Sequence, residues 1–422
     1  LAFHLENKSA EPKEIPIEFV IKGTLDRTDV WEFAGAQSST PAPMKAEGNS
    51  LVKERESFAA VLRSDLPGLQ WDETSTSWKT TFPLSAREKK DGCVVFGIGE
   101  KSEVTAACDA ILANPEKALA DTREEYQQRL RDLFERLPKL EAENDALVKL
   151  YNRSLVHFVT NRWDIPEFVL HPYYSTGSIK GGCVCNYLWN FGEIWEILPL
   201  YDPQAAGEHI KQFLKVDITK HFAFLPITGE AFGPWYPVNQ EKIIGLIYYY
   251  VKNTGDAAFL NETVADKSVL DWVVTHATVL DDPTKPVELI DYGPSNSHLE
   301  LRRGFPYNHV MPDLNGRRYA NYMMASQLCE LAGKPVPYLA ERAQALKVLL
   351  KEQLWNPESK WFWFADDKGT KDTRLTVQLF KLFGSAVLDA DKETGLLSHL
   401  NETEFLSEQG LHSMSKTDIA YD

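Results

Sequence analysis

The sequence predicts a chain of two parts, an antiparallel β-sandwich followed by a toroid of paired α-helices. Up to about residue 105, short β-branched and aromatic runs are bounded by Gly, Pro, Asp and Ser, which is the pattern of a sheet sandwich. From Ala106 onward, apolar residues recur at helical spacing instead. The later helical segments are joined by alternating short and long connections, which favours an α/α toroid.

The strands of the first domain, residues 1–105, are expected in four runs, at 15–22, 57–62, 77–82 and 93–99. A linker helix should occupy residues 106–140. Asn114-Pro-Glu-Lys supplies its start signal, and its apolar spacing lasts until Pro138.

The second domain, residues 141–422, is expected to be the helical one. Its predicted helices are 143–161, 203–215, 237–253, 265–278, 314–333, 336–353 and 373–390, with a weaker one at 188–199. The loops 164–187, 221–236, 283–312 and 355–372 are long and rich in Gly, Pro and aromatic residues. Loops of this kind on a rigid scaffold often carry function.

Composition excludes some function classes. The 45 Lys and Arg against 61 Asp and Glu give a net charge of −16, which disfavours binding to a phosphate backbone. No apolar stretch approaches the roughly 20 residues of a membrane span. The 48 Trp, Tyr and Phe residues fit either a sugar site or a large helical core.

The five cysteines match no disulfide framework or zinc site, so they give little support for a metal site. Most should be buried thiols, which suits a reducing compartment, although a periplasmic or secreted location stays open. The sequence does not indicate an oligomeric state.

Three segments combine aromatic residues with acids or amides. The first holds Trp189, Asn190 and Glu193, of which Trp189 and Glu193 would share a helix face; a plain helix start is the alternative. The second runs into an apolar helix and holds Glu230, Trp235, Tyr236 and Gln240. Capping or solvated residues are the alternative there.

The third segment presents Asp291 on a loop edge after two apolar residues, with Glu300 and Arg302 following. Apolar neighbours would raise the pKa of a carboxyl group, as a general acid requires. In the alternative interpretation, Asp291 caps a turn and Glu300 pairs with an arginine.

The order of these segments resembles the inverting six-hairpin glycoside hydrolases of the trehalase and processing α-glucosidase type. The similarity rests on Trp189-Asn190, Pro226–Gln240, Ile290-Asp-Tyr-Gly, Met311-Pro-Asp-Leu-Asn and Gly410-Leu-His-Ser-Met-Ser. It implies a β-sandwich followed in the sequence by an (α/α)6-barrel. Asn190 departs from the Asp that this group usually has, and the group's general base lies beyond the Gly410 segment. We therefore expect the chain to be part of a longer one, incomplete at both ends.

The resemblance implies hydrolysis of an O-glycosidic bond of an oligosaccharide with inversion, a reaction for which no metal or other cofactor is expected. Asp291 is the expected general acid, with Glu300 as its alternate or partner. Trp189, Trp235 and Tyr236 would form stacking walls, and Asn190, Glu193, Glu230, Gln240 and Arg302 would bind the substrate. Two rivals stay open, a phosphorylase or epimerase on the same toroid and a non-catalytic carbohydrate-binding relative.

Overall fold

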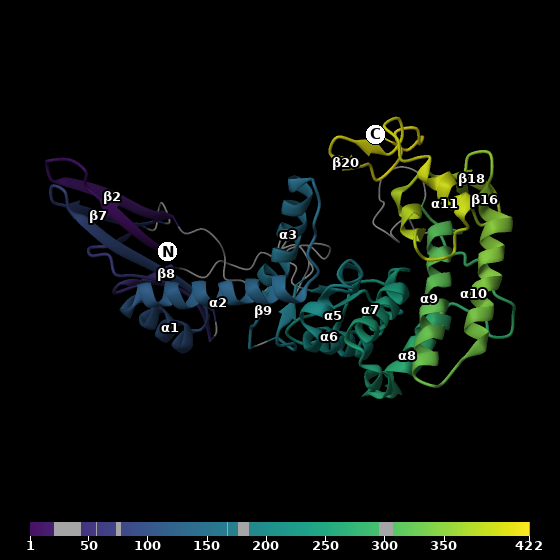
Figure 1. Ribbon diagram of the computed structural model, residues 1–422. Helices are drawn as coiled ribbons and strands as arrows, with labels where there is room; N and C mark the ends of the chain where they lie inside the picture. The colour runs from purple at the N-terminus through teal and green to yellow at the C-terminus, as the bar shows by residue number, and fades with distance from the viewer. Residues whose placement is uncertain are drawn as a thin grey trace. The chain divides into compact units, whose positions relative to one another are not determined.

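The computed structural model describes residues 1–20, 44–55, 57–72, 77–166, 168–175, 185–294 and 307–421 (Figure 1). Contacts within the chain divide it into two compact units, the first built on Leu1–Arg131 and the second beginning at Asp132. The first unit begins with antiparallel strands, and helices dominate the second unit. The predicted class, mixed α and β with the strands first, is therefore confirmed.

The first unit contains two antiparallel sheets. One has the strand order β1-β8-β5-β4-β3 and the other β2-β7-β6. The strands are β1 (Ala2–Glu6), β2 (Lys13–Val20), β3 (Met44–Glu47), β4 (Ser50–Arg55), β5 (Phe58–Ser64), β6 (Gln70–Asp72), β7 (Ser77–Leu84) and β8 (Lys89–Glu100). All four predicted strand runs are present, as β2, β5, β7 and β8.

Alternation along the strands builds two cores in this unit. One face of the larger sheet, with Val61 and Val95, packs on Val104 and Cys108 of helix α1 (Lys101–Ala113). A second cluster joins Phe3 of β1 to Phe82 of β7, and so brings apolar side chains of both sheets together. Period-2 patterning therefore places successive side chains on opposite faces of these sheets, as pleated strands require.

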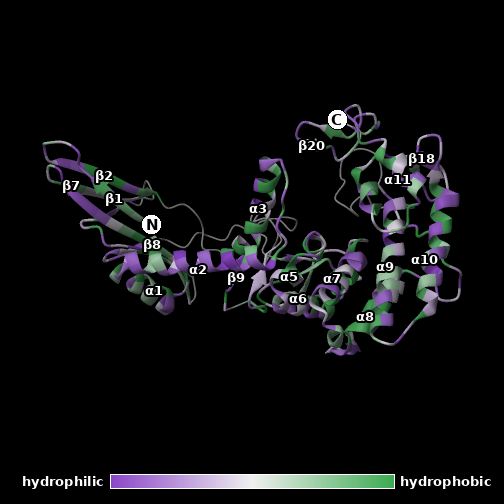
Figure 2. Cartoon of the chain, viewed as in Figure 1, coloured by the Kyte–Doolittle hydropathy of each residue, from purple (hydrophilic) through white to green (hydrophobic). Residues whose placement is uncertain are grey.

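Two helices follow the sheets where one was predicted. Helix α1 begins five residues earlier than expected, directly after β8, and α2 (Pro115–Arg136) begins at the predicted proline. Figure 2 shows α2 as mainly hydrophilic, and Leu133 is the residue it buries. Pro suits the first helical position because it lacks the backbone N–H that would have no partner there, and because its fixed φ is already helical.

Helices of the second unit lie close to the predicted ranges. They are α3 (Asp145–Thr160), α4 (Leu188–Phe191), α5 (Leu198–Tyr201), α6 (Pro203–Lys215), α7 (Asn239–Thr254), α8 (Val269–Thr278), α9 (Pro312–Leu331), α10 (Pro337–Leu349) and α11 (Ala390–Leu397). The short strands are β9 (Arg162–Trp163), β10 (Tyr173–Tyr174), β11 (Asn186–Tyr187), β12 (Ala223–Phe224), β13 (Ala231–Phe232), β14 (Thr263–Val264), β15 (Lys267–Ser268), β16 (Trp355–Asn356), β17 (Trp361–Ala365), β18 (Lys371–Thr373), β19 (Leu406–Ser407) and β20 (Gly410–Leu411).

The predicted helix 373–390 is wrong. The chain forms a short 3-10 helix, η4 (Val377–Leu382), and α11 begins only at Ala390. The side chain of Thr376 caps the start of η4. Gly384, two residues after the end of η4, has a left-handed φ of 74°, which a continuing helix does not allow.

Helices α7 and α9 form the interior of this unit. Both bury side chains around most of their circumference, including charged ones, and they pack against each other. By contrast, α10 buries only Leu339, Ala343 and Leu346 along one stripe.

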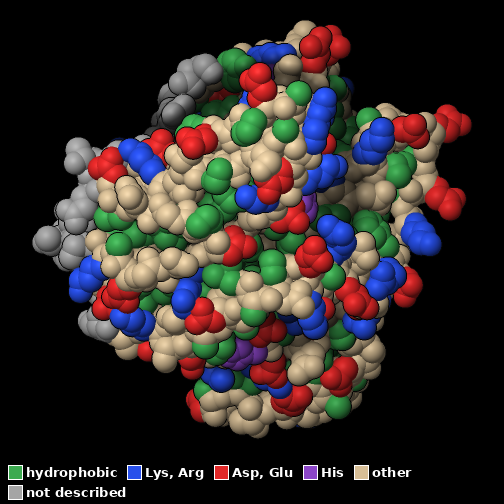
Figure 3. All heavy atoms as spheres, turned by 90° about the vertical axis from the view of Figure 1, so that its left-hand side faces the viewer, with side chains coloured by type: hydrophobic (Ala, Val, Ile, Leu, Met, Phe, Trp, Pro, Cys, Tyr) green, Lys and Arg blue, Asp and Glu red, His purple; other side chains and the backbone are tan. Residues whose placement is uncertain are grey.

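Charges of both signs are mixed on the one face that Figure 3 draws. On the face drawn in Figure 3, Lys and Arg side chains lie interspersed with Asp and Glu, with no continuous area of one sign among the coloured residues. Cys93, Cys108, Cys185 and Cys329 are buried free thiols, as expected for most of the cysteines. No helix in the described ranges has the length and apolar character needed to cross a bilayer.

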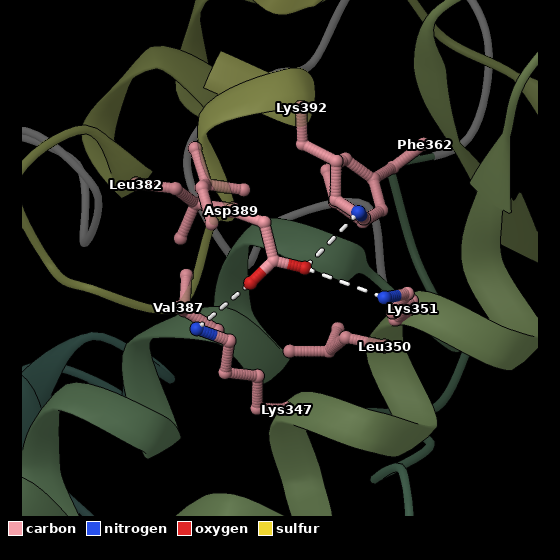
Figure 4. Close-up of a pocket in the computed structure, with 9 residues that line it drawn as sticks. Lys347, Leu350, Lys351, Phe362, Leu382, Val387, Asp389 and Lys392 are labelled. Atoms are coloured by element: carbon pink, nitrogen blue, oxygen red, sulfur yellow. Dashed lines mark hydrogen bonds and ion pairs between the residues drawn. The ribbon is translucent and has the colours of Figure 1, made fainter.

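Three lysines converge on one carboxylate near α11. Figure 4 shows Lys347, Lys351 and Lys392 directed at Asp389, with Nζ–O distances of 3.1, 3.5 and 3.2 Å. Hydrogen bonds from Lys347 and Lys392 lower the pKa of Asp389 to about 2. This carboxylate ties α10 to α11 at a site where the lysines would otherwise repel one another.

We expect the Asp389 cluster to make the free energy of unfolding depend on pH in the acid range. The pKa of this carboxyl is lower in the folded chain than in the unfolded one, so its contribution is complete above about pH 4 and is lost as the pH falls toward 2. Asp389→Asn should lower the urea midpoint at pH 7, and its deficit relative to the unmodified chain should shrink between pH 5 and 2. Asp391→Asn, at an exposed partner of Lys392, is the control. A deficit that stays constant with pH would contradict the assignment.

Candidate functional site

The first two predicted segments meet through aromatic rings. Trp189, in α4, meets Tyr236 edge to face with 5.8 Å between ring centroids. Tyr236 also stacks on Phe222 at 4.9 Å and is only 5% exposed. Tyr236 is thus largely buried between these rings, and its expected role as a stacking wall for substrate stays a prediction.

The second and third segments meet through Trp235 and Tyr292. Trp235 is partly exposed and lies nearly parallel to Tyr292, with ring centroids 6.5 Å apart. Its Nε1 donates to Oε1 of Gln240 at 3.4 Å, and Gln240 is buried in the first turn of α7. Tyr292 directly follows Asp291, so the aromatic pair stands beside the expected acid.

Asp291 is exposed and faces a histidine. Its Oδ1 accepts the backbone N–H of Gly293, and Nδ1 of His309 lies 2.9 and 3.1 Å from its two carboxylate oxygens. Asp291 therefore has the turn-capping role of the alternative interpretation, together with an imidazole partner that the sequence did not indicate.

His309 is held in an unusual backbone conformation. Its φ is 54°, in the left-handed region that a non-glycine residue rarely adopts. Its N–H donates to the carbonyl of Gly293, and its carbonyl accepts the N–H of Tyr292. Such strain persists only where the surroundings fix it, and it occurs often at functional sites.

A cavity of about 290 Å³ lies beside the first segment. Asn190 and Glu193 line it together with polar residues of α3 and the strand β10 region; its lining comprises Ser154, His157, Phe158, Asn161, Tyr174, Ser175, Asn190, Glu193 and Ile194. Amides, hydroxyls, one imidazole and one carboxylate, set beside Phe158 and Ile194, suit a ligand with many hydroxyl groups.

Glu193 joins this cavity to η4. Its carboxylate accepts from Nζ of Lys381 at 3.0 and 3.1 Å, and both side chains are about half exposed. The pair leaves the carboxylate oriented and reachable by solvent. Exposed ion pairs contribute little to stability, so its value here is the orientation of Glu193.

The other predicted residues are placed differently. Glu230 is exposed in the turn between β12 and β13, where its carboxylate accepts from the hydroxyl of Thr228 at 3.2 Å. Glu300 and Arg302 lie outside the described residues.

The sequence reasoning missed a buried ionic cluster, which is formed mainly by residues of α7 and α9. Glu241 pairs with Arg317 and Lys242, and Asp313 accepts from the hydroxyl of Tyr307. Burial opposes ionisation of Glu241, but the charges of Arg317 and Lys242 hold its pKa below the usual value. Burial raises the pKa of Asp313, against the charge of Arg317. The sequence signal that could have revealed this cluster is the presence of charged residues near the starts of two helices that are otherwise apolar enough to be buried.

No group of three or more His, Cys, Asp and Glu side chains in the described part of the chain is arranged to hold a metal ion.

No protein-family model matches the sequence, and no curated protein matches it either. Solved structures do match over most of the chain. They include a protein assigned as a kojibiose phosphorylase from human microbiome (13% identity, TM-score 0.49, 86% of this chain and 52% of that one). A rhamnosidase from Klebsiella oxytoca with rhamnose bound matches with 9% identity and a TM-score of 0.47, over 94% and 79%. A sialidase matches with 11% identity and a TM-score of 0.47, over 87% and 36%. The chain spans about half the length of the first structure.

Proposed function

We propose that this chain carries the site of a carbohydrate-active enzyme, a glycoside hydrolase that cleaves an O-glycosidic bond of an oligosaccharide with inversion. The main support is the position of Asp291, a solvent-accessible carboxylate that directly precedes Tyr292, the buried ring on which the partly exposed Trp235 stacks. Aromatic faces pack on the C–H faces of a sugar ring, while an adjacent carboxyl group can reach the glycosidic oxygen. The 290 Å³ cavity supplies further polar groups in the same unit.

In the proposed reaction, the carboxyl group of Asp291 donates its proton to the glycosidic oxygen as the C–O bond breaks. A water molecule attacks the anomeric carbon from the opposite face, and a second carboxylate takes its proton. Inverting enzymes hold these two carboxyl groups roughly 6.5–9.5 Å apart. Glu300, outside the described residues, remains the alternate or partner of Asp291. Trp189, Asn190, Glu193 and Gln240 are proposed to position the substrate.

The proposal includes an α/α toroid that follows a β-sandwich in the sequence. The alternation of helix environments along the chain supports it, since α7 and α9 are mostly buried whereas α8 and α10 bury one side. Helices that alternate between an inner and an outer layer are what paired-helix barrels require. The two sheets that share the apolar cluster of Phe3 and Phe82 support the sandwich.

Phosphorolysis is the weaker candidate on geometric grounds. Arg317 is paired with Glu241 and Arg318 with Asp281, and all four side chains are largely buried. Neither arginine therefore offers a free charge to inorganic phosphate. Arg302 and Arg303 lie outside the described residues.

The test is an assay on a panel of di- and oligosaccharides with and without inorganic phosphate. We expect phosphate-independent release of reducing sugar, with the product anomer opposite to that of the substrate by proton NMR. Release that requires phosphate would favour a phosphorylase. Sugar binding without turnover of any glycoside would favour a binding protein.

A further inference from the structure

The backbone immediately before Asp291 is held by one side chain of α9. Asn315 accepts the N–H of Ile290 through Oδ1 at 2.8 Å and donates Nδ2 to the carbonyl of the same residue at 3.1 Å. Nδ2 also donates to the carbonyl of Met311 at 3.0 Å. An amide that bonds both the N–H and the C=O of Ile290 fixes the two peptide groups that flank this residue, much as a neighbouring strand would.

Asn315 is itself fixed from the other side. Its side chain is fully buried, and its Oδ1 also accepts from Nη1 of Arg318 at 3.2 Å. The same guanidinium donates to the carbonyl of Glu288 at 2.8 Å and to Asp281 at 2.9 Å. The loop is thereby tied to α9 at two positions, Glu288 and Ile290, just ahead of Asp291.

We propose that Asn315 is a positioning residue for Asp291, acting through the backbone of Ile290. This inference rests on the proposed function, because it assigns Asn315 a part in delivering the general acid. A side chain one peptide away from a reacting carboxyl sets where that carboxyl lies. A misplacement of about 1 Å can lower a rate by about 10²-fold.

The experiment compares two substrates of one sugar, the disaccharide hydrolysed fastest in the panel and the corresponding glycosyl fluoride. Fluoride leaves with little need for a proton, so its hydrolysis reports on everything except the acid. We expect Asn315→Ala to lower kcat on the disaccharide by about 10- to 100-fold with KM within about threefold. Its kcat on the fluoride should stay within about threefold of the unmodified enzyme.

Asn315→Asp keeps an acceptor for the Ile290 N–H and loses the donor to its carbonyl, so a loss between those of the unmodified enzyme and Asn315→Ala is expected. This variant also serves if Asn315→Ala does not fold. Asn321→Ala, on the same helix and similarly buried, is the matched control and should act equally on both substrates.

Equal losses on both substrates, or no loss on either, would overturn the inference. The outcome of Asp291→Asn separates this from failure of the proposed function. If Asp291→Asn spares the fluoride and Asn315→Ala does not, only the role of Asn315 is wrong. If Asp291→Asn shows no preference between substrates, the proposed acid is wrong and the role of Asn315 falls with it.

Discussion

Asp291→Asn should reduce turnover of natural oligosaccharides by about 10²–10⁴-fold, the range that a positioned general acid contributes. The amide can still accept the N–H of Gly293, so the turn should survive and substrate binding should be largely spared. The loss should be much smaller for a glycoside with a very acidic leaving group. Steady-state kinetics on both substrate types, with binding measured by calorimetry, check this result.

Asp282→Asn provides a matched control for that experiment. Asp282 is an exposed aspartate that caps a turn on the same connection, accepting the N–H of Thr284 at 2.9 Å. It pairs with Lys285 rather than with a histidine. Its replacement should leave turnover unchanged. Full activity of Asp291→Asn together with an inactive Glu300→Gln would reverse the two roles.

Glu241→Ala should lower the free energy of unfolding by about 3–5 kcal/mol, the usual cost of removing one partner from a buried ion pair. The substitution leaves the buried charges of Arg317 and Lys242 without their carboxylate. Urea unfolding monitored by circular dichroism measures the change. Because the folded pKa of Glu241 lies below its unfolded value, its contribution should be present at neutral pH and be lost as the pH falls below about 4.5.

Glu193→Ala is the comparison for the buried pair. It removes an acid that pairs with Lys381 at a half-exposed position, where about 1 kcal/mol or less is expected. Similar losses for Glu241→Ala and Glu193→Ala would show that burial of the Glu241 cluster does not determine its contribution.

Local chemistry made several elements predictable. Helix α6 was predicted with its observed bounds, because Asp202 caps it through the N–H of Ala205 and Pro203 opens it. The strand β7 was predictable because Trp78 and Phe82 alternate with solvated residues. In each case the signal lies within a few residues of the element it specifies.

The surroundings of Asp291 could not be predicted in the same way. Its apolar neighbours in sequence predicted an apolar environment, but a turn and His309, which is 18 residues away, determine what the carboxylate contacts. The same holds for Glu241, whose partner Arg317 is 76 residues along the chain. Contacts between distant segments depend on tertiary packing, which spacing in one sequence does not encode.

The Glu193–Lys381 pair joins positions 188 residues apart, and this separation bears on the order of folding events. Local helical contacts form early, whereas a contact across so long a stretch has to await the arrangement of everything between its ends. During refolding, helical circular dichroism should therefore recover before the proposed binding of sugar does. A chain paused between these stages would look folded by its helix content while one wall of the cavity was still unanchored.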